Sequence, residues 1–256
     1  MKIIKLIAFA LAMMLSVNGS AFAESALNKI LSSGVLKAGT TGDFPPFSKR
    51  DTATNDYVGF DIDVLKELAK DMDVEIEFVP TDWKTLVNGI VAGNYDISGS
   101  ASIQAKRMKA AGYSDTYMAV VIKAFTTEDK ISRFNGWDSI NKSGVKTATT
   151  LGTTFETLSK NWFPNSDLTL IEAPARGYQE VLAGRSDVFI TSNVEGSTLL
   201  SKYPNIREIP AEPRNPTPLA MLLPQADQVW INFVDHWVKL KKARGFFDEL
   251  AKKHGL

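Results

Sequence analysis

The segment DISGSASIQAKRM, residues 96–108, decides the fold class, because a strand pattern changes into a helical pattern within it. Residues 96–100 predict a β-strand, and residues 102–108 predict the start of a helix. The segment VKTATTLGTTF, residues 145–155, repeats this order, with a strand, a turn and a helix that begins at Phe155. Strands that alternate with helices predict an α/β protein with mainly parallel sheets.

The rest of the chain follows the same alternation. Further strands are predicted at 35–40, 74–79, 168–171 and 187–191, and helices at 61–71, 83–91 and 176–183. Residues 228–254 predict a long amphipathic helical region. The best internal linker signal is Asn215-Pro216-Thr217-Pro218.

The first 23 residues predict a cleaved secretory signal peptide. Lys2 and Lys5 precede an apolar run, and Ala21-Phe22-Ala23 supplies small residues at the cleavage site. The alternative is a membrane anchor, but the run is shorter than the ~20 residues that a spanning helix needs. We therefore expect a periplasmic protein.

Composition excludes several classes of partner and of stabilisation. The chain has no Cys, so disulfides cannot stabilise it after export. It has 29 basic and 29 acidic residues, and cleavage would remove Lys2 and Lys5, which leaves 27 against 29. This near-neutral balance does not indicate nucleic acid or an anionic membrane surface as a partner.

Two strand–turn–helix units carry clusters of hydroxyl groups, one in each half of the chain. The first holds Ser100 and Ser102 with Arg107, and the second holds Thr153 and Thr154 after Gly152. Free backbone N–H groups at a helix start, together with hydroxyl donors, favour an anion. Ordinary helix capping by Ser or Thr is the alternative for each unit taken alone.

In sequence motifs the chain resembles the family-3 bacterial extracellular solute-binding proteins, the polar amino acid receptors of ABC importers. The matching motifs extend over nearly the whole mature chain: Gly34-Val35-Leu36, Phe44-Pro45-Pro46-Phe47, Gly59-Phe60-Asp61-Ile62-Asp63, Trp83 with Leu86, Asp96-Ile97, Ser102-Ile103 with Arg107, Tyr113-Ser114 with Tyr117, Gly152-Thr153-Thr154 and Gly184-Arg185-Ser186-Asp187. Each motif is weak alone, and their order and spacing together are specific.

The resemblance implies a two-lobe, type II periplasmic-binding-protein-like fold with a ligand cleft between the lobes. Residues 24–117 and 218–256 would form lobe 1, and residues 118–217 would form lobe 2. A small carboxylate ligand, an ABC permease as partner and a monomeric state follow as expectations.

The resemblance also implies roles for individual residues. Ser100, Ser102 and Arg107 would bind a ligand carboxylate from lobe 1, and Thr153 and Thr154 would close on it from lobe 2. An Arg fork pairs bidentately with a carboxylate. The alternative for Arg107 is a surface position on its helix. Phe44 and Trp83 would form apolar walls, and as isolated aromatics they would instead be core residues.

One position departs from the amino acid receptors. They usually carry Asp after the strand predicted at 187–191, where it holds the ligand's α-ammonium, and this chain has Ser192 there. A neutral hydroxyl does not supply the charge-assisted bond that an ammonium needs. An acid without an amine is therefore the expected ligand, unless Asp43 compensates.

Four further stretches carry a narrower resemblance: Thr40-Thr41-Gly42-Asp43, Pro46-Phe47-Ser48, Val79-Pro80-Thr81 with Trp83, and Leu222-Leu223-Pro224. They resemble the cyclohexadienyl dehydratases, exported enzymes of the same fold family that act on prephenate or arogenate. Glu195 falls where these enzymes carry their general acid. Desolvation in a closed cleft would raise the pKa of a Glu as this role requires. The alternative for Glu195 is a first-turn helix residue that faces water. Four polar positions differ from the enzymes: Phe44, Thr154, Ser192 and Leu219. We therefore favour a noncatalytic relative and keep the dehydratase as the alternative.

Neither a metal nor a cofactor is expected. The two histidines, His236 and His254, both fall in the C-terminal helical region and are far apart in sequence. No metal-ligand spacing, phosphate loop or nucleophile elbow accompanies them.

Overall fold

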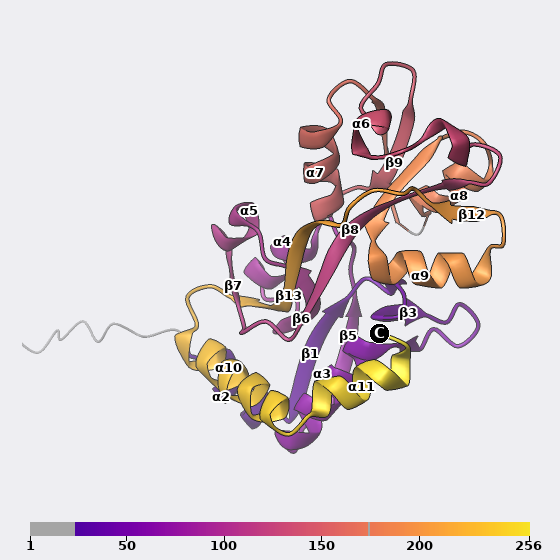
Figure 1. The fold of residues 1–256 in the computed structure, drawn as a ribbon. Coiled ribbons are helices and arrows are strands. Elements are labelled where there is room, and N and C mark those ends of the chain that lie inside the picture. The colour runs from indigo at the N-terminus through magenta and orange to yellow at the C-terminus, as the bar shows by residue number, and fades with distance from the viewer. Residues whose placement is uncertain (1–23, 174) are drawn as a thin grey trace, which may run out of the picture.

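The computed structural model describes residues 24–173 and 175–256. The predicted signal peptide, residues 1–23, lies outside them. One ten-stranded sheet runs through both lobes of the protein (Figure 1), in the order β10-β9-β11-β8-β13-β6-β1-β5, with β12 paired to β8 and β7 paired to β13. Within the described residues, no helix combines the length and apolar character needed to cross a membrane.

The first lobe is built on three parallel strands: β1 (Val35–Thr40), β5 (Glu75–Pro80) and β6 (Ile97–Ser102). Its helices are α2 (Ala26–Ser33), α3 (Phe60–Asp71), α4 (Leu86–Val91) and α5 (Ala105–Met108). Its short strands are β2 (Asp43–Phe44), β3 (Ser48–Arg50), β4 (Tyr57–Val58) and β7 (Ala111–Tyr113). Helix α3 buries Val64, Leu65 and Leu68 at helical spacing, so this one face packs on the core.

The second lobe repeats the arrangement. Its parallel strands are β9 (Lys146–Thr150), β10 (Asp167–Ile171) and β11 (Val188–Ser192). Its other elements are a 3₁₀ turn (Ile131–Arg133), α6 (Trp137–Ile140), α7 (Thr154–Trp162), α8 (Gly177–Leu182), α9 (Asn193–Lys202) and β12 (Ile206–Glu208). The fold is therefore the predicted two-lobe α/β class.

Two long strands, β8 (Met118–Thr127) and β13 (Arg214–Pro224), join the lobes. They pair antiparallel with each other and with their neighbours, so the prediction of mainly parallel sheets is correct within each lobe and wrong between the lobes. The Asn215–Pro218 segment, predicted as a linker, lies within β13, one of the two strands that join the lobes. A register shift between Arg214 and Thr217 accommodates Pro216, which has no N–H to donate. The lobe boundaries at residues 117 and 217 remain a division that we propose.

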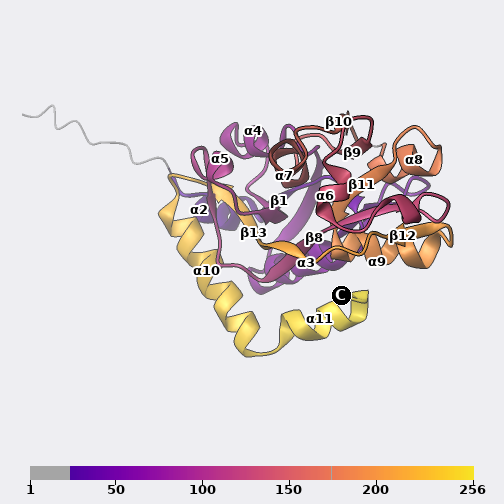
Figure 2. The ribbon, with the colours of Figure 1, turned by 45° about the horizontal axis from the view of Figure 1, so that its top comes forward.

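The predicted C-terminal helical region consists of two helices. Helices α10 (Gln228–Ala243) and α11 (Phe246–His254) are separated at Gly245, whose φ of 72° lies in the left-handed region that favours glycine. Both pack on the first lobe, α10 against α2 and α11 against α3, and Figure 2 shows them along one side of the molecule. Trp230, Val234 and Phe247 join the largest apolar core.

Candidate functional site

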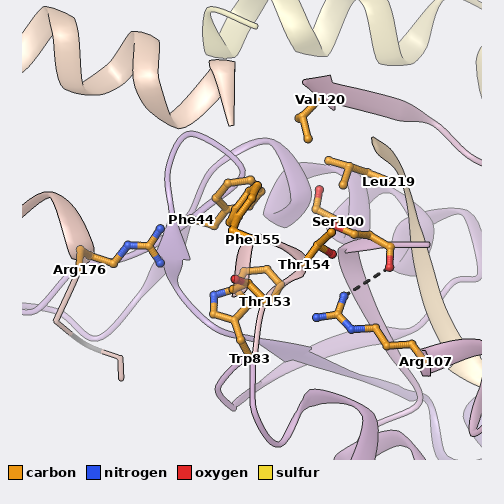
Figure 3. A pocket seen from close by; sticks show the side chains of 11 residues that line it. Phe44, Trp83, Ser100, Arg107, Val120, Thr153, Thr154, Phe155, Arg176 and Leu219 are labelled. Atoms are coloured by element: carbon orange, nitrogen blue, oxygen red, sulfur yellow. Dashed lines mark hydrogen bonds between the residues drawn. The ribbon is translucent and has the colours of Figure 1, made fainter. Parts of the chain in front are cut away.

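A small cavity lies where the two lobes and the joining strands meet (Figure 3). Its lining comes from both lobes: Phe44, Trp83, Ser100, Ser102, Arg107, Val120, Thr153, Thr154, Phe155, Arg176 and Leu219. Seven of the residues predicted for the site are therefore brought together.

Arg107 brings a buried positive charge to this cavity. Strand β6 continues to Ser102 and helix α5 begins only at Ala105, so Ser102 ends a strand rather than starting the predicted helix. Arg107 as a whole is 6% exposed, and its guanidinium donates to two backbone carbonyls, Ser102 O at 3.4 Å and Gly152 O at 3.2 Å. Burial lowers the pKa of Arg107, and Tyr113 offsets part of this effect. Within the described residues no carboxylate pairs with Arg107.

Phe44 and Trp83 form an aromatic wall. Their rings meet edge to face, with centroids 5.8 Å apart, and both line the cavity. Trp83 lies in the turn before α4, which begins at Leu86 rather than at Trp83 as predicted. The Trp83 Nε1–H donates to Asp43 Oδ1 at 2.8 Å, which fixes the ring.

The second lobe contributes the turn before α7. The Thr153 hydroxyl donates back to the Thr150 carbonyl at 2.6 Å and makes no capping bond to the helix, so the capping alternative is wrong for this side chain. The Gln104 amide of the first lobe donates to the Thr154 hydroxyl at 2.9 Å. This bond holds the two lobes together beside the cavity.

Ser100 lines the cavity while its hydroxyl is engaged elsewhere. It donates to Asp61 Oδ1 at 2.7 Å, and the Tyr117 hydroxyl donates to the same atom at 3.0 Å. Burial raises the pKa of Asp61 to about 7, although the two hydrogen bonds lower it in part. Ser100 therefore connects the cavity to a buried, protonatable carboxyl group.

Sequence reasoning missed Arg176 as a site residue. It immediately precedes α8, whereas the sequence pattern predicts it as the first residue of that helix. Its Nη1 lies 2.7 Å from Asp43 Oδ2 in the first lobe, and its Nη2 lies 2.6 Å from Glu195 Oε1 in the second. Burial lowers the pKa of Arg176, but the neighbouring carboxylates of Glu195 and Asp43 outweigh this and raise it. The sequence indicated this role only by placing a basic residue directly before a helix.

Ser192 and Glu195 lie beside the cavity rather than in its lining. Ser192 ends β11 and is fully buried, and its hydroxyl accepts from the Glu195 N–H at 3.1 Å as the cap of α9. Glu195 is 1% exposed and accepts from the Thr191 hydroxyl and from Arg176. The alternative that Glu195 faces water is therefore wrong.

The model of the family "Bacterial extracellular solute-binding proteins, family 3" matches residues 36–256. The chain belongs to this family. Its fold, with a cavity between two lobes joined by two strands, agrees with that membership.

Individual family-3 relatives include both an enzyme and binding proteins. Cyclohexadienyl dehydratase from Pseudomonas aeruginosa is 29% identical over 224 residues, which are 87% of this chain and 83% of the enzyme. The structure of an ancestral amino acid-binding protein, a precursor of cyclohexadienyl dehydratase, is 32% identical with a TM-score of 0.84, and the match covers 90% of this chain and 99% of the ancestor. A binding component of an ABC transporter from Wolinella succinogenes, complexed with lysine, is 26% identical with a TM-score of 0.80 and coverages of 86% and 95%.

Proposed function

We propose that this family-3 protein is a periplasmic receptor that captures a small carboxylate without an amine and delivers it, as a monomer, to an ABC importer. The observation that supports this most strongly is the buried Arg107 guanidinium, which lines the cavity and, within the described residues, donates to two backbone carbonyls and pairs with no carboxylate. A buried charge without a counter-charge is costly, so a carboxylate bound beside Arg107 gains a strong, charge-assisted pair.

The charges around the cavity support an acid over an amino acid. Within the described residues the lining contains no acidic side chain, and of its two arginines Arg107 has no carboxylate partner, whereas Arg176 is already paired with Asp43 and Glu195. Asp43, which could have held an ammonium in place of Ser192, already accepts from Trp83 and Arg176. A ligand ammonium would therefore be desolvated without an available carboxylate partner.

A second candidate function is prephenate or arogenate dehydration with Glu195 as general acid. The burial of Glu195 and the similarity to the Pseudomonas enzyme favour it. A general acid must carry its proton near neutral pH. Here Arg176 Nη2 lies 2.6 Å from Glu195 Oε1, and the Thr191 hydroxyl donates to Glu195 Oε2, so both carboxyl oxygens already have partners within the protein. These contacts support a receptor over an enzyme.

Ligand-driven closure tests the proposed receptor function. A panel of carboxylic and keto acids is screened for binding, and the best acid is titrated into the wild-type protein and into Arg107→Ala while small-angle scattering follows compaction. Losing one partner of a buried charged pair costs roughly 3–5 kcal/mol, so the variant should bind more than about a hundredfold more weakly. Lys106→Ala, an exposed neighbour on the same short helix, is the matched control and should bind normally. Equal affinity in wild type and Arg107→Ala would remove Arg107 from the site.

A further inference from the structure

Arg176 lies between two carboxylates that come from opposite lobes. Its two terminal nitrogens pair with Asp43 at 2.7 Å and with Glu195 at 2.6 Å, and all three side chains are less than 10% exposed. Two carboxylates around one guanidinium give the cluster a net charge of −1. The two carboxylates together carry more charge than the one guanidinium between them. The folded protein therefore strongly favours keeping the Arg176 guanidinium in this position.

The position of Arg176 separates two spaces. Arg176 lines the inner cavity and also a larger groove that opens outward, whereas Asp43 and Glu195 line only that groove. Figure 3 shows Arg107 and Arg176 on different sides of the inner cavity, with Phe44 and Trp83 between them. A ligand whose carboxylate pairs with Arg107 would therefore extend its other end towards Arg176.

We propose that Arg176 is a specificity-determining residue, a tethered cation that fills the place where a ligand's amine or guanidinium would sit between Asp43 and Glu195. A cleft would hold a cationic ligand group in the same way, between carboxylates that its two lobes contribute. Here the chain supplies that cation itself. The proposal rests on the proposed receptor function and names the basis of its selectivity against amines.

The same side chain indicates what the far end of the ligand carries. Arg176 Nε is buried, and within the described residues it has no hydrogen-bond partner. An unmet buried donor favours an acceptor atom on the ligand. Because the cluster is already net negative, a second carboxylate would be repelled, and a neutral keto or hydroxyl oxygen would not. The ligand class is therefore a monocarboxylic keto or hydroxy acid.

The proposal is tested by deleting the Arg176 side chain and then supplying a soluble guanidinium compound to fill its place. Arg176→Gly deletes the side chain, and propylguanidinium, the excised fragment, is added at millimolar concentration. The variant should melt about 10 °C lower than wild type, because a buried pair has been broken, and propylguanidinium should raise its melting temperature. Neutral propylurea should have no effect. Arg185→Gly, which removes an exposed Arg from its pair with Glu180 in the same lobe, is the matched control and should respond to neither compound.

A second readout is ligand preference. Calorimetric titration with L-lysine and L-arginine should give no binding to wild type and measurable binding to Arg176→Gly, or to Arg176→Gln if the glycine variant does not fold. Rescue by propylguanidinium together with this gain would support the proposal. If wild type binds keto acids through Arg107 but neither variant gains affinity for a cation, the tethered-cation proposal is wrong and the receptor function stands. If no acid binds wild type at all, the receptor function itself fails.

Discussion

Gly152 of the second lobe lies directly against the backbone of Lys84 in the first. A Cβ atom at Gly152 would be 2.6 Å from Lys84 N and 2.7 Å from Lys84 Cα, closer than real Cβ atoms approach backbone. The Gln104–Thr154 hydrogen bond and the Lys84–Glu172 ion pair, at 3.3 Å, also cross between the lobes here. The structure therefore represents a closed cleft, and a residue without a side chain is required at this contact.

Gly152→Ala should weaken ligand binding by blocking closure. Overpacking of a tight contact typically costs 1–3 kcal/mol, so affinity for the best acid should fall about tenfold or more. Gly144→Ala is the matched control, because its φ of 79° equals the 78° of Gly152 within a degree and nothing lies within 4 Å of its Cβ position. Both variants should lose a similar amount of folding free energy, because each places Ala at a positive φ. Only Gly152→Ala should lose affinity for the acid in calorimetric titration. Unchanged affinity in Gly152→Ala would show that binding does not need this closed contact.

Prephenate should be converted slowly or not at all. Glu195 is paired with Arg176, and Phe44, Thr154, Ser192 and Leu219 differ from the residues expected in the dehydratases. General acid catalysis contributes about 10²–10⁴-fold in rate, and positioning of the substrate contributes separately. Phenylpyruvate formation, followed by absorbance, should therefore stay near the uncatalysed rate. Efficient turnover that is lost in a folded Glu195→Gln variant would establish the enzyme instead.

The sequence predicted the fold class and most of the cavity lining, because those features depend on local patterns. A strand followed by hydroxyl residues and a helix predicts where Ser102, Arg107 and Thr153 lie, and the structure brings all three to one cavity. The family resemblance supplied Phe44 and Trp83, which isolated aromatics would not indicate.

Arg176 could not be predicted in the same way, because its role depends on contacts remote in sequence. Asp43 is 133 residues away from it, and only the closed arrangement of the lobes brings the two side chains together. Ser192 illustrates the reverse case. The family resemblance placed it at the ligand, but its hydroxyl caps α9, and a capping side chain is committed to the backbone.

Asp61 should make the stability of the protein fall as pH rises. Its pKa is 3.8 in the unfolded chain and about 7 in the folded protein, so between these values the folded state holds more protons. Its contribution is fully present below about pH 4 and is lost as pH rises towards 7, by no more than about 4 kcal/mol. The free energy of unfolding, measured with urea at several pH values in this range, should fall with rising pH in the wild type relative to Asp61→Asn. Asp248→Asn, which alters an exposed carboxylate, should parallel wild type, and a parallel Asp61→Asn curve would exclude a protonated Asp61.

A thermal-shift comparison of keto acids with their amino acid counterparts tests the central claim most directly. Each pair, such as phenylpyruvate with phenylalanine or pyruvate with alanine, differs only at the α-carbon, which carries an oxo group in one acid and an ammonium group in the other. At a hundredfold excess over Kd, a ligand of the folded state should raise the melting temperature by about 5–10 °C. We predict that at least one keto or hydroxy acid gives this shift, that its amine counterpart gives none, and that Arg107→Ala abolishes it. Selective stabilisation by an amino acid, with no response to the paired keto acid, would contradict the proposed function.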